Sequence, residues 1–197
     1  MHIVGVLLAA GSGSRFGGDK LRHPLAPERD AAAPPQASRV PMGVVTCRKL
    51  VDALSETIAV VRTTDVALDA MLRDAGARVI ACADAGLGMG HSLACAIAAT
   101  ADADGWVVAL GDMPWVRQAT IRALADALRG GASIAAPWHR GQRGNPVAFA
   151  AAHGPALIAL RGDRGARDLL AAHAAVIRRV DVDDAGVLRD VDVGADL

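Results

Sequence analysis

The sequence predicts an α/β protein with helices on both faces of a mostly parallel sheet, which gives three α/β/α layers. Two observations carry this prediction. Seven apolar runs of strand length alternate along the chain with stretches whose apolar residues repeat at helical spacing. The runs are apolar almost throughout, as expected for strands buried on both faces. The chain of 197 residues is long enough to bury a full core, so we expect a single domain over residues 1–197.

Each strand is predicted from an unbroken apolar run, and each helix from apolar residues three or four positions apart. The predicted strands span residues 3–9, 57–62, 79–83, 106–110, 133–136, 147–150 and 176–180. The predicted helices span residues 42–54, 65–74, 92–99, 117–128, 155–160 and 166–173. In the helix at 117–128, Ile121, Leu124 and Leu128 lie on one face, which should pack on the sheet.

Residues 23–41 break both patterns, because they are rich in proline, alanine and charged side chains. This composition indicates a long mobile loop next to the first strand's loop, and not a linker between two domains. Two interpretations stay open for it: a lid over a bound ligand, or a simple disordered insertion.

The composition argues against several classes of partner. The 21 basic residues balance 21 acidic ones, so no overall charge favours nucleic acid or an anionic membrane. Aromatic residues make up only 3% of the chain, which leaves few platforms for stacking single-stranded bases. A small soluble ligand is the better expectation.

Cysteine usage and the amino-terminal segment indicate a reducing compartment. Cys47, Cys82 and Cys95 are an odd number without C-x-x-C spacing, which favours reduced thiols over a disulfide or a zinc site. No basic region precedes the first apolar run, which is only about as long as a strand, so we expect no signal peptide. The protein should therefore be cytoplasmic.

Residues 4–21, VGVLLAAGSGSRFGGDKL, form an apolar strand followed by a glycine-rich loop with two cations, Arg15 and Lys20. Glycine lets backbone N–H groups close around an anion, and the cations offset phosphate charge, so the loop indicates a nucleoside triphosphate site. A Walker A loop is excluded, because Asp19 separates the glycine from the lysine and no Ser or Thr follows. A dinucleotide fingerprint fits poorly, because Phe16 stands in place of its third glycine.

The pattern LAAGxxxRFGxxKL resembles the amino-terminal signature of the nucleotidyltransferases related to molybdenum-cofactor guanylyl- and cytidylyltransferases. The resemblance implies a Rossmann-like fold of the nucleotide-diphospho-sugar transferase type. It also implies catalytic roles for Arg15 and Lys20. The nucleotide site that it implies contains Leu8, Ala9, Ala10, Gly11, Gly13 and Lys20.

A carboxylate, Asp112, follows the predicted strand 106–110 in the segment GDMP. Ligands of open α/β sheets collect at the carboxyl ends of strands, so Asp112 and the glycine-rich loop can face one crevice. There, the carboxylate is either a ligand of Mg²⁺, with Mn²⁺ as the alternative ion, or the cap of the next turn. Because the related enzymes carry the same GDMP segment, the resemblance implies the metal ligand.

The chain ends in LRDVDVGADL, where Asp190 and Asp192 alternate on one face of an expected edge strand. They are either solvated acids or the source of a second metal ligand opposite Asp112. The resemblance implies that Asp192 is that ligand. Its pattern is closer to DIDTPxDL, from which Val193 and Gly194 depart.

The segment GLGMGHSL, residues 86–93, offers bare backbone that can read a base edge and a ribose, and His91 or Ser92 should cap the helix that follows. The resemblance implies nucleotide contacts from Gly88, Gly90 and Ser92. For His91 we expect a general polar role and no part in catalysis.

The loop PWHRGQRGNPVAF can supply cations and an amide to a second anionic substrate, or it is a solvated basic loop. The resemblance favours the first interpretation and assigns Arg143 and Asn145 to the acceptor. In the segment RGDRGAR, Arg164 or Arg167 is a secondary candidate for the same substrate.

Taken over nearly the whole chain, these motifs resemble the molybdenum-cofactor cytidylyltransferases. The resemblance implies CMP transfer from CTP to a molybdopterin-type cofactor, with pyrophosphate as the second product and a molybdenum hydroxylase or its chaperone as partner. The alternatives are a guanylyltransferase on the same acceptor, a sugar-phosphate nucleotidyltransferase, or a non-catalytic cofactor-binding chaperone. Such a transfer needs alignment and charge stabilisation and no covalent intermediate.

Overall fold

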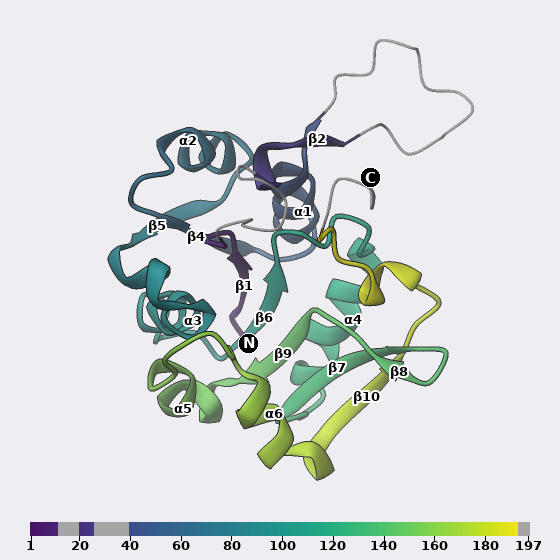
Figure 1. Ribbon diagram of the computed structural model, residues 1–197. Helices are drawn as coiled ribbons and strands as arrows, with labels where there is room; N and C mark the ends of the chain where they lie inside the picture. The colour runs from purple at the N-terminus through teal and green to yellow at the C-terminus, as the bar shows by residue number, and fades with distance from the viewer. Residues whose placement is uncertain (12–19, 26–39, 193–197) are drawn as a thin grey trace, which may run out of the picture.

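The computed structural model describes residues 1–11, 20–25 and 40–192, and it confirms the predicted α/β architecture (Figure 1). Its centre is an eight-stranded sheet in the order β10-β7-β9-β6-β1-β4-β5, with β8 paired to β7. The strands are β1 (Ile3–Leu8), β4 (Glu56–Arg62), β5 (Arg78–Cys82), β6 (Gly105–Leu110), β7 (Ile134–His139), β8 (Gln142–Arg143), β9 (Val147–Ala150) and β10 (Ile177–Asp181).

The sheet is mostly parallel, as predicted, because only β8 and β9 run against the other strands. At its centre, Leu8 of β1 pairs with Leu110 of β6 and with Val60 of β4. The carboxyl ends of β1, β4 and β6 therefore meet at one edge. Since β9 runs antiparallel between β6 and β7, its amino end lies at that same edge.

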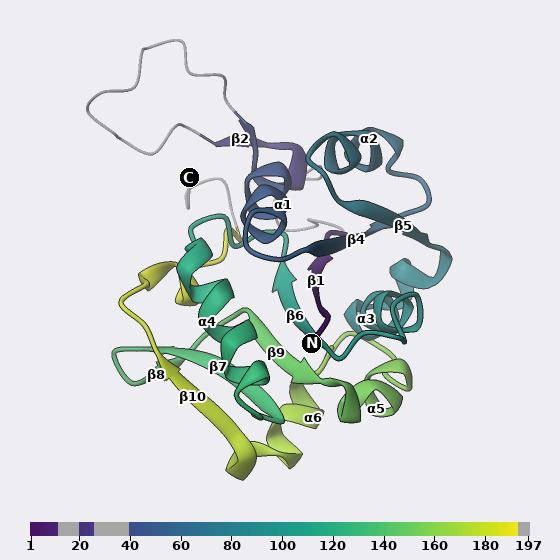
Figure 2. The ribbon, with the colours of Figure 1, turned by 180° about the vertical axis from the view of Figure 1, so that it is seen from behind.

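Helices cover both faces of the sheet. The face that Figure 2 presents carries α1 (Met42–Val51), α2 (Val66–Asp74) and α4 (Gln118–Arg129). The opposite face, seen in Figure 1, carries α3 (Met89–Ala98), α5 (Gly154–Ile158) and α6 (Arg167–Ala172). Strand β1 is buried along its whole length, and its alternate side chains enter the two cores: Ile3 and Leu7 the first, Val4 and Val6 the second. This double burial explains its unbroken apolar sequence.

Three predicted boundaries differ from the structure by three residues. Helix α1 ends at Val51 and not at residue 54. Helix α3 begins at Met89, with Gly88 at the N-cap position instead of His91 or Ser92. Strand β7 extends to His139, and β8 pairs back on it, so part of the predicted loop is a hairpin. Backbone pairing explains the longer strand, because Trp138 pairs with Asp181 of β10 and His139 with Gln142 of β8.

The segment 23–41, predicted as a loop throughout, has structured ends. Its first and last described residues form the antiparallel pair β2 (Pro24–Leu25) and β3 (Val40–Pro41). The N–H of Met42 also donates to the carbonyl of His23 at 3.0 Å, which closes the base of the segment. Residues 26–39 lie outside the described residues, so the lid stays a prediction.

The three cysteines are free thiols. Burial raises the pKa of Cys47 to about 11, and burial together with the neighbouring Cys82 raises the pKa of Cys95 to about 11. Neither is a reactive thiolate at neutral pH. Among residues 1–11, 20–25 and 40–192, no helix is both long enough and apolar enough to cross a bilayer.

Candidate functional site

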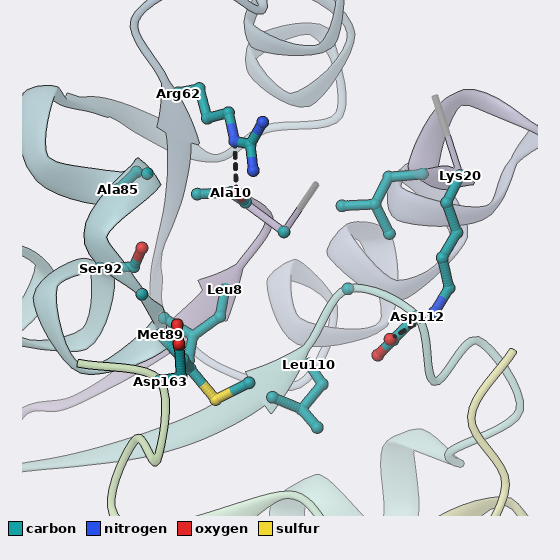
Figure 3. Close-up of a pocket in the computed structure, with 15 residues that line it drawn as sticks. Leu8, Ala10, Lys20, Arg62, Ala85, Met89, Ser92, Leu110, Asp112 and Asp163 are labelled. Atoms are coloured by element: carbon teal, nitrogen blue, oxygen red, sulfur yellow. Dashed lines mark hydrogen bonds and ion pairs between the residues drawn. The ribbon is translucent and has the colours of Figure 1, made fainter. Parts of the chain in front are cut away.

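A pocket of about 300 Å³ opens at the carboxyl edge of β1, β4 and β6, where the strand-end argument predicts a site (Figure 3). It has the size of a small-ligand site. The residues that line it are Leu8, Ala10, Gly11, Lys20, Leu21, Arg62, Ala85, Gly86, Gly88, Met89, Ser92, Leu110, Gly111, Asp112 and Asp163.

The glycine-rich segment enters this pocket from the end of β1. Leu8, Ala10 and Gly11 line the pocket, whereas Ala9 packs into the core on the α1 side. The Nε of Arg62, at the end of β4, donates to the carbonyl of Ala10 at 2.8 Å and fixes the path of the chain there. Two predicted residues of this segment, Gly13 and Arg15, lie outside the described residues.

Asp112 is held in place by backbone contacts on both sides of β6. The N–H of Gly111 donates to the carbonyl of Leu8 at 3.0 Å, and the hydroxyl of Thr46 donates to the carbonyl of Gly111 at 3.1 Å. Gly111 leaves room for Leu21, since a Cβ at that position would lie 3.0 Å from the Leu21 Cδ1. The turn after β6 is thus locked to β1 and to α1, and the carboxylate faces the pocket.

Lys20 brings the two predicted metal-binding carboxylates together. Its Nζ lies 2.8 Å from Asp112 Oδ2 and 3.7 Å from Asp192 Oδ1 (Figure 3 shows the first contact). The Lys20 side chain is only 11% exposed, so solvent screens its contact with Asp112 less than its contact with the more exposed Asp192.

The carboxyl-terminal tail reaches Asp112 by a route that the sequence analysis did not predict. Residues 190–192 are not a strand. One hydrogen bond, from the N–H of Val191 to the carbonyl of Asp112 at 3.0 Å, holds the tail, with Val191 completely buried. Neighbouring side chains of an extended chain point to opposite sides, so the exposed Asp190 and Asp192 lie on the side opposite the buried Val191. Asp192 contacts Lys20.

The two carboxylates fit a divalent ion that arrives with a nucleotide. Within the described part of the chain, no group of three or more His, Cys, Asp or Glu side chains could hold a metal ion. Asp112 and Asp192 nevertheless converge on one positive centre, the Lys20 ammonium. Proteins commonly hold Mg²⁺ by one or two carboxylates, and phosphate and water oxygens complete its shell. This donor set is therefore suited to a metal–nucleotide complex.

The glycines of the segment 86–93 serve packing as well as the pocket. Gly88 has φ 123°, and a Cβ there would collide with the backbone of Gly162 and the carboxylate of Asp163. Gly90 does not line the pocket; its N–H donates to the carbonyl of Gly162 at 2.7 Å, and a Cβ would press on the turn before α6. Ser92 does line the pocket. Of the three predicted nucleotide contacts, the geometry thus places two at the pocket and one behind it.

His91 has the polar role that its position suggests. Its Nδ1 accepts the N–H of Gly162 at 3.2 Å, which joins α3 to the turn before α6. The ring therefore positions the turn that carries Asp163 to the pocket.

A second pocket, of about 250 Å³, adjoins the first and shares Leu8, Met89 and Leu110 with it. Four polar side chains line it: Arg143, Asn145, Arg164 and Arg167. The remaining lining residues are apolar: Leu93, Val108, Val147, Phe149, Ala166 and Leu170. A charged rim over an apolar floor suits a substrate with an anionic group on a flat body.

The RGNPV segment reaches this pocket because β9 is antiparallel. The amino end of β9 lies beside the carboxyl end of β6, and the residues before β9 are fixed to the carboxyl-terminal tail. The N–H of Asn145 donates to the carbonyl of Val187 at 2.9 Å, and a Cβ on Gly144 would collide with that same carbonyl. The tail thus supports Asp112 on one side and Asn145 on the other.

The residues of the first pocket that were not predicted as site residues include Arg62, Met89 and Asp163. For Arg62 a signal was present, because it ends a predicted strand at the edge where ligands bind. For Asp163 there was none, because the turn before α6 reaches the pocket only through its packing on Gly88 and Gly90.

Comparison with known sequences gives two findings. The family model described as MobA-like NTP transferase domain matches residues 5–176. Purine catabolism protein PucB of Bacillus subtilis (strain 168) is 30% identical over 205 residues, which cover 97% of this chain and 92% of that protein.

Solved structures of other proteins share the fold of this chain. The crystal structure of Rv0371c from Mycobacterium tuberculosis H37Rv has a TM-score of 0.80 at 28% identity, with 100% of this chain and 96% of that one covered. A manganese complex of the same protein has a TM-score of 0.76 at 27% identity, with the same coverage of 100% and 96%. Molybdopterin-guanine dinucleotide biosynthesis protein A from Archaeoglobus fulgidus has a TM-score of 0.67 at 17% identity over 98% of this chain and 94% of that one, which shows the shared fold alone.

Proposed function

The chain belongs to the MobA-like NTP transferase family and is a nucleotidyltransferase, and from this premise we propose that it transfers CMP from CTP to the molybdenum cofactor. The products are the cytosine dinucleotide form of the cofactor and pyrophosphate. A molybdenum hydroxylase or its chaperone would receive the product. A non-catalytic cofactor-binding chaperone disagrees with membership of a family of NTP transferases.

The observation that carries this proposal is the wall that the two pockets share. Leu8, Met89 and Leu110 line both, so ligands in the two pockets would meet above these side chains. Lys20 and Asp112 line the first pocket, with Asp192 in contact with Lys20, and the guanidinium groups of Arg143 and Arg167 line the second. This arrangement supports a triphosphate donor on one side and a phosphate-bearing acceptor on the other.

The transfer is a displacement at the α-phosphorus. A terminal phosphate oxygen of the acceptor attacks the α-phosphorus of CTP, the bond from that phosphorus to the bridging oxygen breaks, and pyrophosphate leaves with the electron pair. Lys20 offsets the charge that develops on the pyrophosphate, as the resemblance also implies for Arg15. Asp112 and Asp192 would hold Mg²⁺, or Mn²⁺ as the manganese complex of Rv0371c suggests, which supplies charge neutralisation between the phosphates.

The base preference rests on the segment LAAG. Ala10 lines the first pocket, where the guanylyl branch more often has glycine. Its Cβ takes up space in a pocket of about 300 Å³, and this favours a pyrimidine over the larger purine. We therefore expect a higher kcat/KM with CTP than with GTP.

The test incubates the purified protein with Mg²⁺, molybdenum cofactor and each nucleoside triphosphate in turn, and the products are identified by mass. Acceptor-dependent pyrophosphate and a product larger by CMP support the proposal. A guanine dinucleotide product assigns the protein to the guanylyl branch instead. Turnover with a sugar phosphate, but none with the molybdenum cofactor, rejects the acceptor.

A further inference from the structure

Lys20 occupies the position in which a metal ion would contact both carboxylates. Its Nζ is 2.8 Å from Asp112 Oδ2 and 3.7 Å from Asp192 Oδ1, and its side chain is nearly buried. Among the described residues, the ammonium is therefore a counter-ion that both carboxylates share.

The ammonium and a divalent ion cannot share this position. Like charges a few ångströms apart repel strongly in a weakly solvated site. A metal ion held by both carboxylates thus requires the Lys20 ammonium to leave, and a displaced ammonium needs another anion nearby. The phosphates of a bound nucleotide are such anions, and Lys20 already lines the pocket that would hold them.

The exchange needs only a rotation of the Lys20 side chain, because the residue that follows Lys20 is fixed by packing. Leu21 is held between two glycines: a Cβ on Gly43 would lie 3.2 Å from the Leu21 carbonyl oxygen, and one on Gly111 would lie 3.0 Å from its Cδ1. The backbone that carries the two carboxylates is held independently of Lys20, since the N–H of Val191 donates to the carbonyl of Asp112 at 3.0 Å. The backbone on which both carboxylates stand therefore stays in place when the ammonium moves.

We propose, on the premise of the metal-dependent transfer above, that Lys20 blocks the acidic pair to free metal ions and moves to the phosphates when metal and nucleotide enter together. Lys20 then acts in two opposite ways. Without nucleotide it weakens metal binding, and with nucleotide it strengthens the binding of the metal–nucleotide complex.

The test measures Mn²⁺ binding directly, from the electron paramagnetic resonance signal of free Mn²⁺, without any nucleotide. Lys20→Met should lower the Kd for Mn²⁺ about tenfold or more relative to the wild type. Lys20→Arg keeps the charge and should bind as weakly as the wild type. Lys49→Met is the matched control: it removes a cation that contacts the Pro114 carbonyl on the same turn, and it should shift the Kd by less than about twofold.

The same titration with CTP present should show the opposite sign. Lys20→Met should bind the Mn²⁺–CTP complex about tenfold more weakly than the wild type, because a charge-assisted phosphate contact is lost. In the double variant Lys20→Met/Asp112→Asn, the gain in Mn²⁺ binding without nucleotide should disappear. Circular dichroism checks each fold, and Lys20→Gln replaces Lys20→Met if the latter is misfolded.

An equal or higher Kd for Mn²⁺ in nucleotide-free Lys20→Met, or in Lys20→Gln where that variant replaces it, overturns this proposal. A gain in Mn²⁺ binding that survives Asp112→Asn overturns it as well. Failure of the proposed function has a different signature. In that case wild-type protein binds no Mn²⁺–CTP and forms no product, while the nucleotide-free comparison still reports whether Lys20 blocks the acidic pair.

Discussion

At the scale of single residues, the charge of the Lys20 cluster sets its chemistry. Among the described residues, the Lys20 ammonium contacts two carboxylates, Asp112 at 2.8 Å and Asp192 at 3.7 Å. A divalent cation bound between these carboxylates would add positive charge that favours a triphosphate. We expect the carboxylates to matter more for turnover than for folding, since Asp112 remains 27% exposed and Asp192 52% exposed.

Asp112→Asn should lower kcat by about 10² to 10³ at an unchanged fold, because it removes a charge that supports the transition state and hardly alters packing. Asp192→Asn should lower kcat in the same direction. Asp190→Asn is the control, since its exposed side chain follows the same stretch of tail, and kcat should stay within about threefold. Steady-state kinetics and circular dichroism check these values. Near-normal kcat in Asp112→Asn would remove Asp112 from the site.

Arg143→Ala should raise the KM for the acceptor about tenfold and leave the Kd for CTP nearly unchanged, because an arginine–phosphate contact contributes about 1.5–3 kcal/mol. Arg140→Gly is the control: Arg140 lies in the same hairpin at φ 49°, which glycine adopts readily, and it does not line the second pocket. A changed Kd for CTP at normal acceptor KM would place Arg143 on the donor side.

At the scale of elements, the carboxyl-terminal tail organises the site from outside the sheet. The 3₁₀ helix η5 (Ala185–Leu188) lies against the turn after β6, since a Cβ on Gly186 would collide with the Trp115 backbone. The guanidinium of Arg189 stacks 4.1 Å from the Trp115 ring centre. The buried carboxylate of Asp184 accepts three hydrogen bonds: from the Arg117 N–H at 2.8 Å, the Thr120 hydroxyl at 2.6 Å and the Gly186 N–H at 3.0 Å.

Asp184→Ala should lower the free energy of unfolding by about 1–3 kcal/mol, because buried donors lose their acceptor. It should also reduce kcat, since the tail carries Asp192 to the cluster. Asp183→Ala, one position earlier and exposed, should cost less than about 0.5 kcal/mol. Urea unfolding and kinetics measure both effects. A destabilised Asp184→Ala enzyme with normal kcat would separate the tail from the active site.

The sequence allowed prediction where local patterning decides the structure. Asp112 could be placed because an apolar strand must end at a known edge of the sheet, whereas the assignment of Arg143 to the acceptor rests on the resemblance and stays a prediction. The route of the tail could not be predicted, because one Val191 hydrogen bond and a buried Asp184 replace any strand pattern. The packing of Gly90 on the turn before α6 could not be predicted for a related reason: a glycine that admits a neighbouring turn looks the same in sequence as one that admits a ligand.

At the scale of the whole molecule, the reversed strand β9 combines two kinds of binding loop at one edge. The parallel strands β1, β4 and β6 bring their carboxyl ends there, and β9 brings the loop before its amino end. The layers were predictable because burial on both faces leaves a clear apolar signature. The direction of β9 was not, since its short apolar run reads the same in either direction.

Far from the site, His153 should make stability depend on pH. The residue is 8% exposed, and its Nε2 lies 2.6 Å from the Ser133 hydroxyl oxygen. Burial, with a smaller effect from His173, lowers the pKa of His153 below 6.5. Unfolding restores the ordinary pKa and lets the ring take up a proton, so the free energy of unfolding should fall as the pH drops below 6.5. His153→Gln should make that fall shallower in urea unfolding. Equal pH slopes would contradict this account of His153.

The central claim, nucleotidyl transfer at the α-phosphorus, is tested most directly by following isotopic label from CTP. The wild-type protein is incubated with Mg²⁺, molybdenum cofactor and CTP labelled with ³²P at the α or the γ position. The account predicts that α-label appears in the dinucleotide cofactor, that γ-label appears in pyrophosphate, and that both depend on the acceptor. Transfer of the γ-label to the acceptor, or pyrophosphate release without any labelled dinucleotide, would contradict it.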